Sequence, residues 1–201
     1  MDLKKVKKHA KNAWHFIWED DSALSWVLNV VIAFILIKFI VYPGLGFIFG
    51  TNYPIVAVVS GSMEHDENFD GWWDIQKDFY LERNITKEEF KTFRFNSGFN
   101  TGDIMVLFGT KPEKIKVGDV IVFSTSTRPD PIIHRVVRVW TENNELFFQT
   151  KGDHNDAINT YVNEGKISKD RYIGRSVFRI PLLGWIKIYA VNVINFVGSK
   201  I

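Results

Sequence analysis

Two serines on either side of a glycine, Ser60 and Ser62, are the first residues of this chain that could carry out covalent chemistry. They follow an apolar run and lie in the segment 59–64. A serine hydroxyl becomes a nucleophile only when a base takes its proton, and a donor must then stabilise the oxyanion that forms on the attacked carbonyl. Ser-Gly-Ser is also a common turn sequence, so these residues alone do not identify a site.

His134 is the candidate base for such a serine. It lies in the mostly apolar run 132–137, where a neutral imidazole would offer one donor and one acceptor nitrogen. A core histidine whose nitrogens bind backbone groups fits the same pattern. The residue types alone leave both interpretations open.

Two carboxylates, Asp153 and Asp156, lie in the loop 150–156 and could orient the imidazole of His134. A Gly-Asp loop is also typical of an ordinary turn. Lys151 in the same loop raises a serine–lysine mechanism as an alternative, although it does not occupy the strand position of the base.

Metal, cofactor and nucleic-acid functions find little support. The chain has no cysteine, its five histidines show no His-Glu-x-x-His spacing, and 153–156 lacks the alternation of an EF-hand loop. The net charge is +2, but five lysines among the first eleven residues supply the positive balance, and the remainder is slightly acidic. We expect no metal, no cofactor and no nucleic-acid partner.

Short β-branched and aromatic runs separated by turn residues predict a mostly antiparallel β domain over residues 44–180. The expected strands cover 55–59, 104–108, 120–123, 132–140, 146–150 and 172–180. Asn143 and Asn144 tolerate positive φ, which favours a hairpin between the fourth and fifth of these runs. The aromatic-rich stretch at about 66–100 is expected to be an inserted lobe with a short helix beginning at the capping sequence Thr86–Glu89, and its tryptophans are expected to be core residues.

An apolar segment at 23–43 is expected to be a transmembrane anchor. Between residues 23 and 42 it holds thirteen Leu, Ile, Phe and Val residues, which favour insertion by roughly 4 to 8 kcal/mol against roughly 3 for the single charge, Lys38. It is longer than the apolar core of a cleaved signal peptide, and no small-x-small site follows it. The glycine-rich residues 44–50 are expected to form a loop where the chain leaves the membrane.

The lysines precede the anchor, so the positive-inside rule predicts that the basic tail 1–22 is cytoplasmic and that the β domain faces the exterior of the cell membrane. The C-terminal segment 181–201 is apolar but interrupted by Lys187, Asn192 and Asn195. It either lies on the membrane or spans it, and the first is favoured.

Four motifs in order resemble the type I signal peptidase family: residues 60–64 (Ser-Gly-Ser-Met-Glu), 118–123, 134–136 (His-Arg-Val) and 151–153 (Lys-Gly-Asp). A histidine in the base position, where typical bacterial enzymes carry lysine, is similar to the branch found in archaea and the endoplasmic reticulum. The resemblance extends from the anchor to about Gly184. It implies a signal-peptidase-like antiparallel β catalytic domain with a small inserted lobe, preceded by one N-terminal transmembrane helix.

The resemblance also implies roles for individual residues. Ser62 would be the nucleophile, His134 the base, and Asp153, with Asp156 as a second candidate, would support the base. Ser60 and the backbone N–H of Ser62 would hold the oxyanion. The chain departs from the family pattern after 60–64, where His65 replaces a proline. It departs again beyond Gly-Asp, where Asn159 occupies the more usual spacing of the second family aspartate.

The implied function is a membrane-bound serine endopeptidase that removes N-terminal signal peptides from secretory preproteins. Its expected partners are those preproteins, the lipid bilayer and the protein translocation channel. The alternative from another class is a non-catalytic, membrane-anchored β domain with an accessory or binding role.

Overall fold

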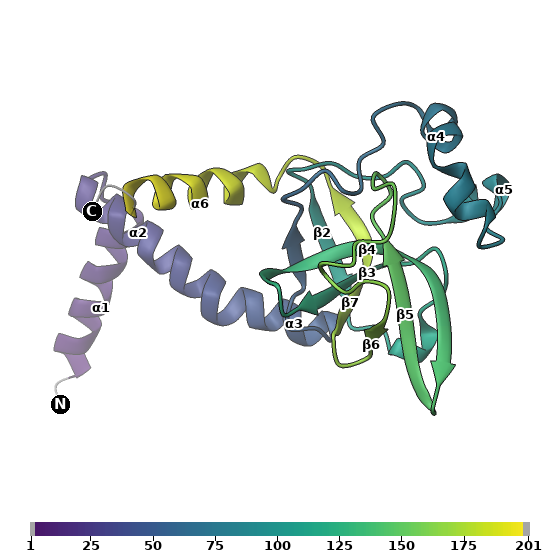
Figure 1. Cartoon of the computed structure of the whole chain (residues 1–201). Coiled ribbons are helices and arrows are strands. Elements are labelled where there is room, and N and C mark those ends of the chain that lie inside the picture. Colours follow the sequence, from purple (N-terminus) through teal and green to yellow (C-terminus); the bar gives the residue numbers. More distant parts are fainter. Residues whose placement is uncertain (1–2, 199–201) are drawn as a thin grey trace. The chain divides into compact units, whose positions relative to one another are not determined.

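A computed structural model describes residues 3–198 of the chain. Within this range the chain forms two compact units, which divide between Ile48 and Phe49. Helices make up the first unit, and the second contains a single β-sheet (Figure 1).

The first unit contains a surface-exposed helix and the start of a long apolar one. Helix α1 covers Leu3–Trp18, within the segment expected to be a tail. Helix α2 (Ala23–Leu36), a π-helical turn (Ile37–Val41) and α3 (Tyr42–Phe49) then form one continuous helix, Ala23–Phe49, of 27 residues. Its length and composition are sufficient to cross a bilayer.

The expectation of a loop at 44–50 was wrong, because the helix continues to Phe49. The π turn comes directly before Pro43, whose ring in a regular α-helix would clash with the carbonyl four residues earlier. The widened turn therefore allows the helix to continue through the proline. It ends at Gly50, whose φ of 65° is the left-handed conformation typical of a residue that terminates a helix.

The second unit is built on one sheet of seven antiparallel strands in the order β1-β2-β7-β3-β4-β5-β6. This confirms the mostly antiparallel β fold. The strands are β1 (Ile55–Ala57), β2 (Ile104–Phe108), β3 (Val120–Thr125), β4 (Arg128–Glu142), β5 (Glu145–Lys151), β6 (Ile167–Ser168) and β7 (Tyr172–Ile180), with a 3-10 turn at Pro112–Lys114.

The hairpin between β4 and β5 forms as predicted. Asn143 and Asn144 have φ values of 49° and 64°, and Glu142 pairs with Glu145 across the turn. Two successive positive φ values are what a two-residue hairpin requires to match the twist of its strands. This hairpin fixes β5, and the loop that follows it, beside β4.

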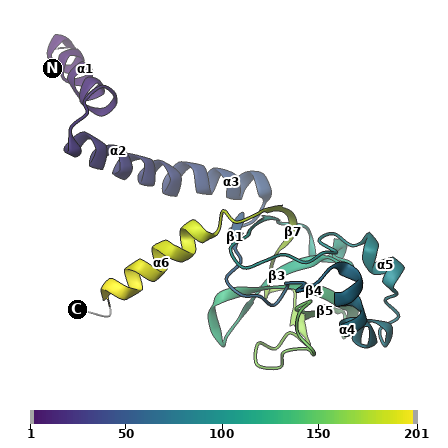
Figure 2. The ribbon, with the colours of Figure 1, turned by 90° about the horizontal axis from the view of Figure 1, so that it is seen from above.

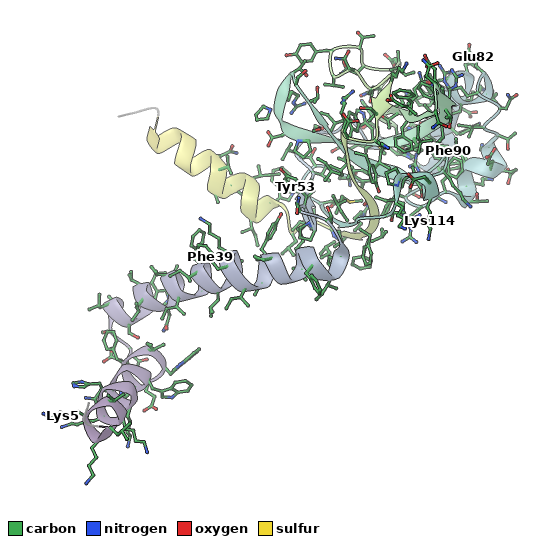
Figure 3. The ribbon with its side chains drawn as sticks, turned by 90° about the horizontal axis from the view of Figure 1, so that it is seen from below. Lys5, Phe39, Tyr53, Glu82, Phe90 and Lys114 are labelled. Atoms are coloured by element: carbon green, nitrogen blue, oxygen red, sulfur yellow. The ribbon has the colours of Figure 1, made fainter. Side chains whose placement is uncertain are left out.

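The inserted lobe contains two helices, α4 (Phe69–Leu81) and α5 (Lys87–Thr92), which lie together at one end of the sheet (Figure 2). Thr86 caps α5 by accepting a hydrogen bond from the N–H of Glu89, as the capping sequence predicts. Trp72 and Trp73 are buried and pack with Tyr80 and Phe90, so the tryptophans are core residues. Figure 3 labels Phe90 within this lobe. The sequence did not predict a helix over α4.

The C-terminal segment contains helix α6 (Trp185–Gly198). The N–H of Gly184 donates to the carbonyl of Gly102 at the point where the chain leaves the sheet. Residues 199–201 of the expected membrane segment lie outside the described residues. Its relation to the membrane stays a prediction.

Candidate active site

The segment carrying Ser62 leaves β1 and turns back over the sheet. The N–H of Val58 donates to the backbone carbonyl of Asp103, and the side chain of Met63 is fully buried in the core cluster that contains Val58. Ser62 is half-buried and Ser60 is exposed. The core therefore anchors this turn on both sides while its hydroxyls stay accessible.

His134 lies in β4, paired with Ile121 of β3, and it reaches the serine predicted as nucleophile. Its Nε2 is 3.0 Å from the Oγ of Ser62, although 72 residues separate them in the chain. The imidazole is almost completely buried. This is the distance at which a base accepts a hydroxyl proton.

The carboxylate on the other imidazole nitrogen belongs to Glu164, which the sequence did not identify. Glu164 Oε2 hydrogen bonds to His134 Nδ1 and accepts from the hydroxyl of Thr150 at 3.1 Å. Its Oε1 accepts from the N–H of Asn159 at 2.6 Å. The side chain is fully buried. Three donors around a dry carboxylate hold it in one orientation against the imidazole.

Asp153 was expected to support His134, but within residues 3–198 the hydrogen bonds of its carboxylate go to other side chains. Its carboxylate accepts from Arg135 Nε at 2.9 Å and Nη2 at 2.6 Å, and from the hydroxyl of Tyr80 at 3.2 Å; His65 Nε2 lies 3.2 Å away. Burial alone would raise the pKa of Asp153, but the Arg135 guanidinium and the hydrogen bond with His65 hold it well below its usual range.

Strand alternation explains why Asp153 goes to a different partner. Successive side chains of a strand point to opposite faces, so His134 and Arg135 diverge. Thr150 of β5 lies on the face of His134, and Lys151, paired with Arg135, lies on the other. The chain continues from Lys151 to Asp153 on the Arg135 face, where the carboxylate neutralises the guanidinium.

Asp156, the second predicted acid, is exposed and forms no hydrogen bond to His134 in the part of the chain that the structure describes. Asp156 favours the charged form of Lys151, although burial lowers the pKa of that amine overall. A carboxylate in water is a weak partner for a buried imidazole, since solvent screens it. The exposed position of Asp156 therefore does not support a role in orienting His134.

Lys151 is fully buried on the Arg135 face, which argues against a serine–lysine mechanism. Its Nζ donates to Gln76 Oε1 at 2.8 Å and to the carbonyls of Gly152 and Asp153. Burial lowers its pKa to about 8. The basic group at hydrogen-bond distance from Ser62 Oγ is the imidazole of His134.

Gly152 allows the loop to pass directly over the site. A Cβ at this position would lie 2.6 Å from the carbonyl oxygen of Ser62 and 2.9 Å from His134 Nε2. The same loop also holds the backbone of Ser62 in place, because the N–H of His154 donates to the carbonyl of Ser62 at 3.0 Å. Any larger residue at 152 would displace the backbone of Ser62 and the imidazole of His134, and would thereby disturb the contact between the Ser62 hydroxyl and Nε2.

A groove of about 190 Å³ opens above Ser62 and His134. It runs between the edge strand β1 and the start of β4, and residues of the 155–162 loop close its end. Ser60 borders it, with its Oγ 3.4 Å from that of Ser62. Its remaining lining is Val56, Ala57, Val59, Arg128, Pro131, Ile132, Ile133, Asn155, Asn159 and Val162.

The chain is similar in sequence to catalytic subunits of signal peptidase complexes. No protein-family model matches the chain. The signal peptidase complex catalytic subunit SEC11 of Scheffersomyces stipitis is 28% identical over 162 residues, which are 79% of this chain and 78% of that protein. The subunit named sec11 in Sclerotinia sclerotiorum is 27% identical over 177 residues, covering 86% of this chain and 84% of that protein.

A third relative, signal peptidase complex catalytic subunit SEC11C of Homo sapiens, is 28% identical over 152 residues, or 74% of this chain. The chain spans 62% of the length of that relative, less than two thirds. The similarity therefore extends over most of this chain.

Proposed function

The chain is a homologue of signal peptidase complex catalytic subunits, and we propose that it is itself a membrane-bound serine endopeptidase that removes N-terminal signal peptides from secreted preproteins. The single observation that carries the proposal is the hydrogen-bonded series Ser62–His134–Glu164, whose first two members line an open groove. Nucleophile, base and orienting carboxylate stand in the order that acyl transfer requires.

In the first half of the proposed reaction, Ser62 Oγ attacks the scissile carbonyl while its proton passes to His134 Nε2. Glu164 accepts the hydrogen bond from Nδ1–H, which keeps Nε2 free to act as the base and stabilises the imidazolium that forms. Collapse of the tetrahedral intermediate transfers that proton to the leaving amine and frees the mature protein. A water molecule, deprotonated by His134, then hydrolyses the acyl-enzyme and releases the signal peptide.

The oxyanion requires donors that point at the attacked carbonyl. We assign them to the backbone N–H of Ser62 and the hydroxyl of Ser60, whose Oγ lies 3.4 Å from the nucleophile. Ser60 is exposed at the edge of the groove, where a substrate carbonyl can approach its hydroxyl. Loss of one such donor typically lowers kcat by roughly 10²- to 10³-fold.

The groove suits an extended, apolar substrate. Strand β1 is at the end of the sheet order, so its outer edge can pair with the backbone of a peptide. Ala57 and Val59 from one side, with Ile132 from the other, leave shallow apolar walls. We therefore assign the site to peptides with small side chains before the scissile bond.

The long helix Ala23–Phe49 serves in this proposal as the membrane anchor, with residues 1–22 cytoplasmic and the β unit on the exterior face of the cell membrane. A preprotein leaving the translocation channel holds its apolar signal segment in the same bilayer. Asp153 supports the fold of the catalytic loop in this scheme, and Asp156 has no assigned role.

The test is cleavage of a preprotein with a small-x-small site by the full chain reconstituted in liposomes. The intact chain and a Ser97→Ala control, which changes an exposed serine outside the groove, should release the mature fragment. Ser62→Ala should release none. Equal cleavage by Ser62→Ala would refute the nucleophile, and absence of cleavage by the intact chain would favour the non-catalytic alternative.

A further inference from the structure

Helix α1 has two chemically distinct faces. At about 100° per residue, Leu3, Val6, Trp14 and Ile17 fall within roughly 80° of arc, which we call the apolar stripe. The helix contains no acidic residue and five lysines, all exposed, which lie outside that stripe: Lys4, Lys5, Lys7, Lys8 and Lys11. Figure 3 shows Lys5 projecting away from the helix.

The apolar stripe is largely uncovered. Leu3 is 73% exposed and Trp14 is 63% exposed, and Trp18, beside Trp14 at a ring separation of 5.7 Å, is 66% exposed. Tryptophan is enriched where an apolar surface meets water at a membrane boundary. These side chains therefore form an exposed apolar surface, which contact with a membrane interface would stabilise relative to water.

The junction with the long helix fixes where this surface lies. Ser25 Oγ donates to the carbonyl of Phe16 at 2.6 Å, and Asn29 Nδ2 donates to that of Ile17 at 2.7 Å. Both carbonyls belong to the last turn of α1 and would otherwise have no helical partner. Ser25 and Asn29, near the start of the apolar helix, thus hydrogen bond to the end of α1 and hold the two helices together at their junction.

We propose that α1 lies on the surface of an anionic lipid bilayer, with the apolar stripe in the acyl boundary and the lysines at the headgroups. Its place directly before a helix able to cross the membrane keeps it within reach of that surface. Lys7 and Lys11 lie along one edge of the stripe, so their stems can cover apolar surface while the ammonium groups reach phosphates. Uniform positive charge matches an anionic surface.

This inference rests on membrane insertion of Ala23–Phe49 and not on the proposed peptidase activity. It goes beyond a basic tail that sets topology, because it assigns α1 a lipid-binding face. It also accounts for Ser25 and Asn29, which are otherwise unfavourable in a membrane span.

The absence of cysteine allows a direct test on the full chain. Val6→Cys places a polarity-sensitive fluorophore on the apolar stripe, and Asn12→Cys, an exposed position on the opposite side of α1, is its matched control. In vesicles that contain phosphatidylglycerol, the Val6 probe should be quenched by nitroxide lipids and protected from iodide. The Asn12 probe should show the reverse.

Vesicles of phosphatidylcholine alone and a triple variant, with Lys4, Lys8 and Lys11 changed to Gln, isolate the electrostatic part. In either case, iodide should again quench the fluorophore at position 6. Equal protection in both lipids would overturn the requirement for anionic lipid. Iodide access to both probes in anionic vesicles would overturn the proposal and favour a protein partner.

Failure of the chain to float with vesicles would overturn the membrane insertion on which the proposal rests. Peptidase assays on soluble peptides would test the proposed function separately.

Discussion

His134 and Arg135 are neighbours in sequence, yet each has its own carboxylate on its own face of the sheet. Glu164 bonds to the imidazole and Asp153 to the guanidinium. One carboxylate therefore serves the proposed chemistry and the other the stability of the fold. Substitution of the two acids should separate these effects.

Glu164→Gln should lower kcat on the order of 10³- to 10⁴-fold with a small change in thermal stability. A glutamine amide can donate to Nδ1, which would leave the proton on Nε2, where it cannot accept from Ser62. Glu164→Asp should recover part of the rate because it restores the acceptor. Steady-state kinetics with melting curves measure both quantities, and a Glu164→Gln enzyme of ordinary kcat would exclude the assigned role.

Asp153→Asn should instead destabilise the fold by about 3 to 5 kcal/mol, because it leaves the buried charge of Arg135 without a counter-ion. Asp156→Asn, at an exposed position, is the control and should stay within about 0.5 kcal/mol of the parent. Denaturant unfolding gives these free energies. If Asp153→Asn were as stable as Asp156→Asn but inactive, Asp153 would be the acid of the site after all.

The effect of Asp153 should depend on pH in a defined direction. Its pKa in the fold lies below the ordinary value, so its stabilisation is complete above about pH 4 and is lost only as the pH falls toward the folded-state pKa. The difference in unfolding free energy between the parent and Asp153→Asn should therefore be constant from neutral pH to about 4. It should narrow in stronger acid. A difference that disappeared near neutrality would contradict the ion pair.

Motifs predicted the nucleophile and the base, but not the third member of the series. Ser62 and His134 stand in recognisable local sequences, whereas Glu164 lies in a loop without one. The available signal was Asn159 at the spacing where a family aspartate is usual, since an uncharged amide there implies a carboxylate from elsewhere. In the fold, the N–H of Asn159 binds Glu164. The sequence could not show which acid lies beside His134 Nδ1, because that depends on the path of the loop that carries Glu164.

At the scale of elements, α4 of the inserted lobe supports the loop that crosses the site. Trp72 Nε1 donates to the carbonyl of Asp153 at 3.1 Å, and Gln76 accepts from Lys151 and donates to the carbonyl of His154. The same loop holds the carbonyl of Ser62. The lobe is thereby connected to the nucleophile through two successive layers of hydrogen bonds.

Trp72→Phe should lower kcat by up to roughly 10²-fold and leave KM unchanged, because it removes one donor to the loop and none of the groove lining. Trp73→Phe, the same substitution in the same aromatic cluster, is the matched control. Melting curves must be compared so that loss of folded protein is not read as loss of rate. Equal kcat values for the two variants would show that the lobe does not position the loop.

Local patterns predicted strands and turns well and helix limits poorly. The positive φ of Asn143 and Asn144 is a property of two residues, so the hairpin could be read directly. The extent of α4 depends on burial of Trp72, Trp73 and Tyr80 against a distant strand, which no local pattern contains. The helix beyond Pro43 likewise depends on a π turn.

At the scale of the whole molecule, the proposed membrane anchor limits how far the proposed peptidase can reach. Ser62 follows Phe49, the last residue of the long helix, by only thirteen residues. That length of chain spans at most about 45 Å when fully extended, so the nucleophile cannot work far from the membrane. A substrate whose signal segment shares the bilayer is confined to the same narrow layer.

Cleavage should therefore be much faster when enzyme and preprotein occupy the same vesicles than when they are reconstituted into separate ones. Confinement replaces a bimolecular encounter with one at high effective concentration, which commonly raises apparent affinity by roughly 10²- to 10⁴-fold. A soluble peptide with the same cleavage site should be hydrolysed equally by both preparations, which controls for enzyme content, and Ser62→Ala should be inactive in both. Equal preprotein cleavage in shared and separate vesicles, with the peptide control unchanged, would mean that the helix Ala23–Phe49 only localises the enzyme and contributes nothing to its selection of membrane-inserted substrates.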